Sequence, residues 1–161
     1  MKDMVLYWLP VFMLPAGNIL ALFFGPITFD PRIFLFSLIG AVAEELFFRW
    51  QLLGQIFLPR IKPVLAVLLV SVLFAAMHLF NLRNGSPLPA ILPQMFCAFC
   101  FSIWAGAVVW RKGSILIPLL AHVLLNATAV TEGTLIPVLA GMLLLADGIL
   151  LMKGNGYEQQ R

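Results

Sequence analysis

Charged residues are scarce in this sequence: they make up 11% of its 161 residues, against about 25% in an average soluble domain. Apolar residues make up 62%, against about 45–50% in such a domain. A chain with so few polar side chains cannot cover its folded surface well enough to stay dissolved in water. The composition therefore excludes an ordinary soluble domain and predicts a protein embedded in lipid.

Two further shortages narrow the possible functions. The net charge is only +3 and the basic residues are dispersed, so no nucleic-acid partner is expected. The chain has two cysteines, Cys97 and Cys100, and both lie inside an apolar segment. We interpret them as small packing residues rather than a redox pair.

The long apolar segments predict an all-α fold, a bundle of about six transmembrane helices. About 20 apolar residues are needed to cross about 30 Å of hydrocarbon. The connections between the segments are short and rich in Pro and Gly, and Asn81–Pro89 is expected to be the longest loop. The chain is therefore expected to form a single transmembrane domain over 1–161, with its functional core at about 33–130. The expected spans are Met4–Phe24, bent or broken by Pro10 and Pro15, then Ile33–Leu58, Val64–Phe80, Ile91–Trp110, Ser114–Val130 and Leu135–Met152.

The positions of Lys and Arg predict how the bundle is oriented. Cytoplasmic loops of membrane proteins carry an excess of these residues. Arg32 and Arg83 fall on one side of the predicted bundle, and both termini are therefore placed in the cytoplasm, on the other side. That side carries Lys2, Arg60, Lys62, Arg111, Lys112, Lys153 and Arg161.

The second predicted span contains three ionisable residues, Glu44, Glu45 and Arg49. Each costs about 2.5–3.5 kcal/mol at the centre of a membrane helix, so such residues usually mark a functional site. Glu45 and Arg49 are four residues apart and are expected to form an ion pair on one helical face. Glu44 is rotated about 100° from Glu45, so its carboxylate is expected to face elsewhere and to act as a general base or acid.

Both histidines of the chain also fall within predicted spans. His78 lies near the end of the third span, with Phe74 one turn before it. His122 and Asn126 are four residues apart in the fifth span, so both side chains are expected to face one space. Each feature alone fits a helix-packing role, such as a buried ion pair or a hydrogen bond between helices. Packing alone, however, does not require the second, unpaired glutamate.

These motifs, taken in order, resemble the CPBP family of CAAX prenyl endopeptidases and bacteriocin-processing or Abi proteins. The resemblance rests on Glu44-Glu45-x-x-x-Arg49, Phe74-x-x-x-His78 and His122-x-x-x-Asn126. It implies an intramembrane glutamic endopeptidase in which Glu44 and His78 activate water. His122 and Asn126 would stabilise the oxyanion, while Glu45, Arg49 and Phe74 would support the site. No metal or other cofactor is implied.

The predicted orientation places these polar groups in the outer half of a membrane, expected to be a prokaryotic plasma (inner) membrane. The prenyl-protease branch of the family works at the cytosolic face, so the active site predicted here lies at the opposite face of the membrane. The expected substrate is accordingly a membrane-anchored or exported protein or peptide, cut near the external membrane face.

Two alternatives remain open on the sequence. Glu44, His78 and His122 include residue types that form catalytic zinc sites, although the sequence has no H-E-x-x-H motif. Buried acids and histidines also form proton relays, so a transporter subunit or an assembly factor without enzymatic activity is the other alternative.

Overall fold

The computed structural model describes residues 4–13, 31–128 and 135–153, and in this part of the chain the regular structure is entirely helical. The predicted all-α class is therefore confirmed. The first helix, Met4–Met13, covers the start of the first predicted span, while Pro15 and the rest of that span lie outside the described residues. The following elements are α2 (Pro31–Glu45), the π-helix η1 (Leu46–Phe57), α3 (Pro63–Met77), the 3₁₀-helix η2 (His78–Asn84), α4 (Leu88–Lys112), α5 (Leu116–Thr128) and α6 (Leu135–Lys153).

Two of the described helical segments, Pro63–Asn84 and Leu88–Lys112, are long and apolar enough by themselves to cross a membrane. The helices Met4–Met13 and Leu116–Asn126 are apolar but shorter. Large apolar side chains are exposed around the bundle, among them Phe12, Phe36 and Trp50, as expected for a surface that faces acyl chains. The six-span architecture stays a prediction, since two of the described helical segments are long and apolar enough to cross a membrane.

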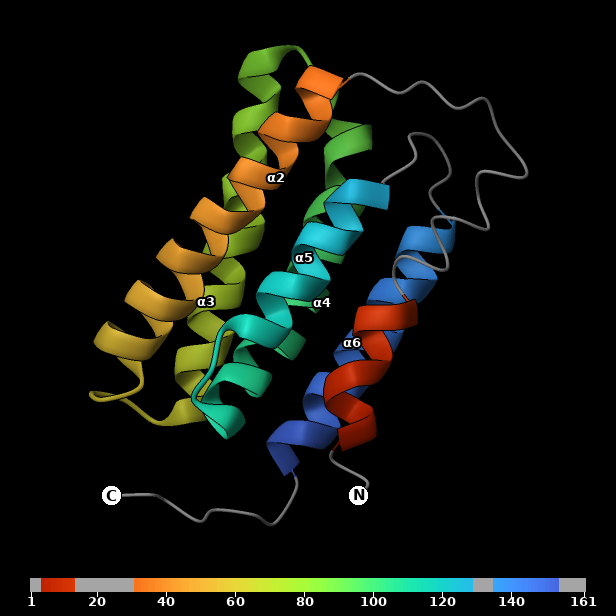
Figure 1. The fold of residues 1–161 in the computed structure, drawn as a ribbon. Coiled ribbons are helices and arrows are strands. Elements are labelled where there is room, and N and C mark those ends of the chain that lie inside the picture. Colours follow the sequence, from red (N-terminus) through yellow and green to blue (C-terminus); the bar gives the residue numbers. More distant parts are fainter. Residues whose placement is uncertain (1–3, 14–30, 129–134, 154–161) are drawn as a thin grey trace.

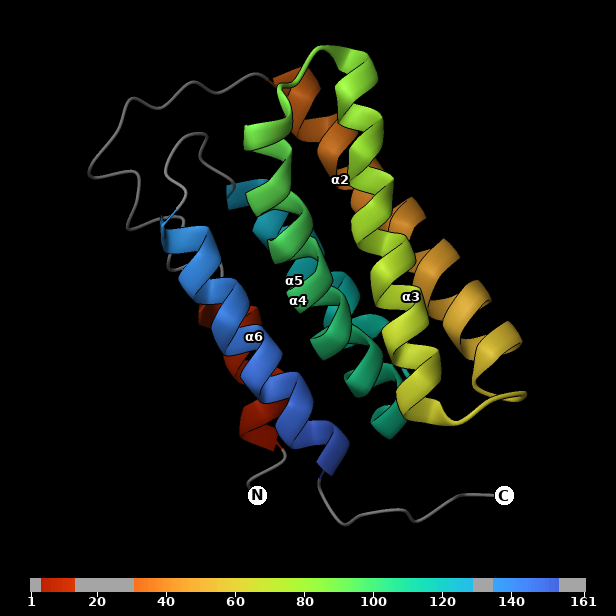
Figure 2. The ribbon, with the colours of Figure 1, turned by 180° about the vertical axis from the view of Figure 1, so that it is seen from behind.

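Helix α4 lies at the centre of the bundle. Ten successive residues, Cys100–Val109, are buried, which is the pattern of a helix covered on all sides. Helices α3 and α6 pack on α4, and α2 packs on α5 (Figures 1 and 2). The indole Nε1 of Trp104 donates a hydrogen bond to the carbonyl oxygen of Leu6 over 3.0 Å, which fixes the first helix to α4.

Successive helices run in opposite directions, so the bundle has two distinct ends (Figure 1). The turns η1–α3 and α4–α5 and the end of α6 lie at one end and carry Arg60, Lys62, Arg111, Lys112 and Lys153. The start of α2, with Arg32, and the end of η2, with Arg83, lie at the other end. Lys2 and Arg161, which were also counted for the orientation, lie outside the described residues.

The prediction of a loop over Asn81–Pro89 is wrong, because most of these residues are helical. The first four residues belong to η2, and α4 already begins at Leu88, with Pro89 in the first turn, where a helix tolerates proline. Gly85 ends η2 with a φ of +88°, and Ser86 N–H donates to the carbonyl oxygen of Asn81 over 3.1 Å. The connection is therefore a tight turn between two helices, closed by its own hydrogen bonds.

Candidate active site

The two glutamates lie where the second helix changes its winding. Helix α2 ends at Glu45 and continues as the π-helix η1, whose C-cap residue Leu58 donates its N–H to the carbonyl oxygen of Leu53, five residues back. A π-helix usually amounts to a single turn and often lies at a functional site. Here it covers 12 residues. Because the winding changes directly after Glu45, the residues that follow do not keep the register of α2.

Glu45 and Arg49 form the predicted ion pair. Arg49 Nε lies 3.2 Å from Glu45 Oε2, and both side chains are fully buried. The side chain of Glu44 is 44% exposed, so it faces a different environment from that of Glu45. The prediction that the Glu44 carboxylate faces a different environment from the Glu45–Arg49 ion pair is therefore confirmed.

His122, from α5, lies between the two glutamates. Its Nδ1 lies 2.9 Å from Glu45 Oε1, and its Nε2 lies 3.8 Å from Glu44 Oε2. The side chain of His122 is only 8% exposed. The sequence did not predict the contact with Glu45, because 77 residues separate the two and no local spacing connects them. It joins Arg49, Glu45, His122 and Glu44 into one continuous polar cluster.

Two aromatic rings enclose this cluster. Phe74 from α3 and Phe101 from α4 contact the His122 ring, with centroid distances of 6.0 and 5.0 Å. The Arg49 guanidinium lies over both rings, 4.1 Å from the Phe74 centroid and 5.5 Å from that of Phe101. The Phe74 ring also contacts His78, as its spacing one turn before that residue predicted. Phe101 was missed, since nothing distinguishes it from other apolar residues of α4.

His78 and Asn126 each hold a hydrogen bond to a backbone carbonyl. His78 opens η2, and its Nδ1 lies 3.2 Å from the carbonyl oxygen of Phe74. Asn126 Nδ2 donates to the carbonyl oxygen of Ser37, on α2, over 3.1 Å. Asn126 therefore also connects α5 to α2, a role that its spacing from His122 did not indicate.

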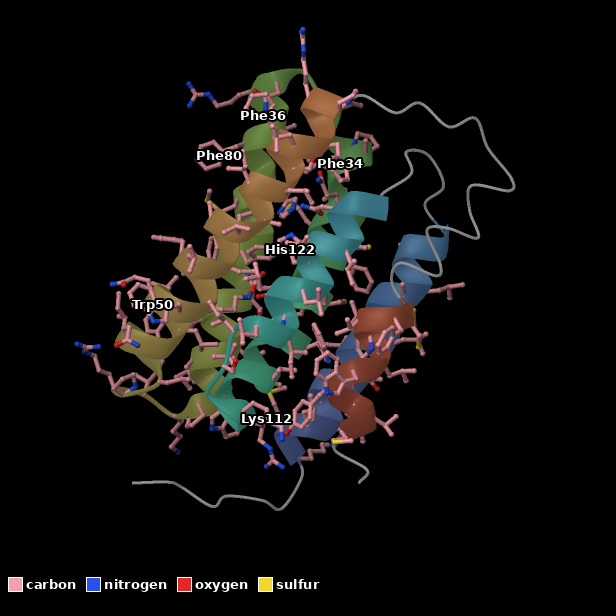
Figure 3. All side chains as sticks on the ribbon, viewed as in Figure 1. Phe34, Phe36, Trp50, Phe80, Lys112 and His122 are labelled. Carbon is pink, nitrogen blue, oxygen red and sulfur yellow. The ribbon has the colours of Figure 1, made fainter. Side chains whose placement is uncertain are left out.

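Glu44, His78, His122 and Asn126 line one cavity of about 960 Å³. Phe74 also lines it, whereas Glu45 and Arg49 lie behind the wall. The cavity extends from Glu44 toward the end of the bundle formed by η2. Figure 3 shows His122 in the interior and Phe36 and Phe80 nearer that end, with Lys112 at the opposite end. The other lining residues are Phe36, Ser37, Gly40, Ala41, Phe48, Met77, Phe80, Asn81, Asn84 and Gln94.

The cavity combines apolar walls with amide groups at its outer end. Asn81 Nδ2 donates to Gln94 Oε1 over 2.9 Å, and both side chains line the cavity together with Asn84. Phe36, Met77 and Phe80 supply apolar surface beside them. Such a lining offers hydrogen-bonding groups for the main chain of a peptide and apolar surface for its side chains.

Across the described ranges, no three His, Cys, Asp or Glu side chains are grouped as metal ligands.

A comparison with protein families identifies the chain. The family model described as type II CAAX prenyl endopeptidase Rce1-like matches residues 26–128, more than half of the 161 residues. No curated protein and no solved structure matches the chain. The matched range includes Glu44, Glu45, Arg49, both histidines and Asn126, which the sequence had singled out. The chain therefore belongs to the Rce1-like family of CAAX-type endopeptidases, which are proteases embedded in membranes.

Proposed function

We propose that this protein is an intramembrane endopeptidase in which Glu44 and His78 activate a water molecule and His122 and Asn126 stabilise the oxyanion. The observation that carries the proposal is the single cavity lined by all four residues, which come from α2, η2 and α5. Peptide hydrolysis requires an activated nucleophile and donors placed where negative charge develops, and the gathering of these four residues in a member of a membrane-protease family supports this assignment.

In the proposed reaction, Glu44 accepts a proton from water while the water oxygen bonds to the carbonyl carbon of the substrate. The electron pair of the carbonyl double bond moves to its oxygen, which becomes the oxyanion. When the carbon–nitrogen bond breaks, the leaving nitrogen takes up the proton that was removed from water. Glu44 suits this role because it lines the cavity and its side chain is 44% exposed, whereas Glu45 is fully buried and paired with Arg49.

The hydrogen bond of His78 fits a role in positioning water. A carbonyl oxygen only accepts, so Nδ1 of His78 must donate to the carbonyl oxygen of Phe74. In the neutral ring Nε2 then carries a lone pair, which can accept a hydrogen bond from the attacking water.

The amide of Asn126 has one donor left for a substrate. Its nitrogen carries two hydrogens, and Ser37 takes one of them. The same hydrogen bond fixes the orientation of the amide group. A donor that is already held in place needs little reorganisation when charge forms on the substrate oxygen.

We place the active site toward the external face of a prokaryotic plasma membrane, with both termini in the cytoplasm. The cavity extends toward the η2 end, which carries Arg32 and Arg83, while Arg60, Lys62, Arg111, Lys112 and Lys153 lie at the other end. By the positive-inside rule the second end is cytoplasmic. A cysteine introduced at Asn84, in a background without Cys97 and Cys100, is expected to react with an impermeant thiol reagent from outside; reaction only from the cytoplasmic side contradicts this placement.

The proposed substrate is a membrane-anchored or exported protein or peptide. The family name points to prenylated CAAX proteins, whose processing at the cytosolic face does not fit the proposed orientation. The reaction is also proposed to proceed without a metal.

The test uses purified protein in lipid vesicles and two synthetic substrates, a prenylated CAAX peptide and an unprenylated peptide with an apolar membrane anchor. We expect wild type to cleave the anchored peptide and Glu44→Gln not to. Asp147→Asn is the matched control, since it makes the same carboxylate-to-amide change on α6, outside the cavity lining. Cleavage of both peptides at equal rates by wild type and Glu44→Gln rejects the glutamate mechanism.

A further inference from the structure

The contact between Glu45 and His122 fixes which nitrogen of the imidazole carries hydrogen. Glu45 is paired with Arg49, which stays protonated in proteins, so its side chain is a carboxylate that only accepts hydrogen bonds. Nδ1 of His122 lies 2.9 Å from Glu45 Oε1 and must therefore be the donor. In the neutral ring, the hydrogen is on Nδ1 and the lone pair is on Nε2.

The surroundings of the ring leave it little freedom to turn over. Phe74 and Phe101 contact it from α3 and α4, and its side chain is only 8% exposed. Nε2 lies 3.8 Å from Glu44 Oε2, in the wall of the cavity. The ring therefore has one nitrogen directed to the buried ion pair and the other directed to the proposed catalytic carboxylate.

We infer that Glu45 is a positioning residue: it holds His122 with hydrogen on Nδ1 and thereby makes Nε2 a proton acceptor facing Glu44. The inference rests on the proposed function, and it gives Glu45 more than a role in packing. A carboxylate that orients an imidazole through Nδ1 and supports a positive charge on the ring is an established device in hydrolytic enzymes.

This arrangement changes how His122 can stabilise an oxyanion. A neutral ring with its hydrogen on Nδ1 has no donor at Nε2, so it cannot donate to the substrate oxygen. It becomes a donor when Nε2 gains a proton. Glu44 Oε2, which accepts a proton from water in the proposed reaction, lies 3.8 Å from Nε2. Transfer of that proton to Nε2 regenerates the carboxylate and forms an imidazolium. The imidazolium then donates to the oxyanion and returns the proton to the leaving nitrogen.

The charged and titratable groups near the ring come from three elements besides α5. Glu44 and Glu45 contact it from α2, Arg49 of η1 lies over the rings of Phe74 and Phe101, and His78 of η2 contacts Phe74.

The test reads the hydrogen positions directly, by ¹⁵N NMR of protein in nanodiscs with labelled histidine. The sequence has two histidines, so a His78→Gln variant assigns the His122 signals. At a pH high enough to leave the ring neutral, we expect Nδ1 to carry hydrogen and Nε2 to show the signal of an unprotonated nitrogen. The reverse pattern in wild type overturns the inference.

Two variants test the role of Glu45. Glu45→Gln should abolish the preference for the His122 tautomer with hydrogen on Nδ1, because an amide can either donate to Nδ1 or accept from it. This variant leaves Arg49 buried without its partner, so the double variant Glu45→Gln/Arg49→Met is measured beside it, with Asp147→Asn as control. An unchanged hydrogen pattern in either variant rejects the positioning role.

Peptide cleavage by the same samples separates this inference from the proposed function. Hydrogen on Nδ1 together with no cleavage by wild type supports the positioning of His122 and rejects the peptidase. Hydrogen on Nε2 together with cleavage that requires Glu44 rejects the positioning role and supports the peptidase.

Discussion

Replacing Arg49 by Met is expected to destabilise the protein strongly. Arg49 and Glu45 are both fully buried, and Arg49 Nε lies 3.2 Å from Glu45 Oε2. Removing one partner of a buried ion pair leaves a charge without compensation and typically costs about 3–5 kcal/mol of unfolding free energy. The loss of the guanidinium over the Phe74 ring, 4.1 Å from its centroid, adds to this cost.

A double-mutant cycle isolates the ion pair from the other consequences. Glu45→Gln/Arg49→Met removes both charges together, and replacing a buried pair is much less costly than breaking it. The double variant is therefore expected to be more stable than Arg49→Met, with a coupling energy of about 0.5–3 kcal/mol. The control is Arg60→Met, since Arg60 is exposed and donates only to carbonyl oxygens at the end of η1, which is worth about 0.3–1 kcal/mol.

The assay is reversible unfolding in mixed micelles with an increasing fraction of denaturing detergent. Unfolding free energies are obtained for wild type, both single variants, the double variant and the control. If the effects of the two single changes on the unfolding free energy are additive, the buried ion pair is refuted. The same holds if Arg49→Met lowers the unfolding free energy no more than Arg60→Met does.

Three further predictions address packing, the oxyanion site and the metal. Gly148→Ala should destabilise the α4–α6 contact by about 1–3 kcal/mol, because an added Cβ would lie 2.9 Å from Ile103 Cγ2 and 3.0 Å from backbone atoms of Trp104. Gly141→Ala on the same helix, where the nearest atom is 3.6 Å away, should be neutral or slightly stabilising in the same unfolding assay. Asn126→Ala should lower kcat about 10²–10³-fold with a smaller change in KM, measured on vesicle-bound peptide; an effect on KM alone contradicts an oxyanion role. Exhaustive chelation should leave cleavage unchanged, and recovery of lost activity by added zinc contradicts the metal-free mechanism.

The positions of the helices could be predicted well because long apolar segments are local signals. The predicted span Ile33–Leu58 corresponds to α2 and η1 together, Pro31–Phe57, and Leu135–Met152 corresponds to α6, Leu135–Lys153. The change from α-helix to π-helix after Glu45 could not be predicted, because an apolar segment has no feature that distinguishes the two windings. The turn at Gly85 was predicted to be part of a longer loop, because Pro and Gly are typical of loops. The same residues also begin and end helices, and the sequence alone does not separate the two cases.

The residues of the candidate site were found because ionisable groups are costly in an apolar span. The Glu45–Arg49 pair was predicted from a spacing of four residues within the predicted span Ile33–Leu58. The contacts of His122 with Glu45 and of Asn126 with Ser37 depend on how α5 packs against α2. The spacing of residues within one helix does not predict this packing. Phe101 was missed for the same reason, since only the packing of α4 distinguishes its ring from its apolar neighbours.

The most direct test of the account is a comparison of protein N-termini in membranes of cells that carry wild type, Glu44→Gln or Asp147→Asn in place of the natural gene. The account predicts new N-termini in membrane-anchored or exported proteins with wild type and Asp147→Asn, and uncleaved precursors with Glu44→Gln. Identical N-termini in all three, at equal levels of the three proteins, would contradict the claim that Glu44 serves peptide hydrolysis within the membrane.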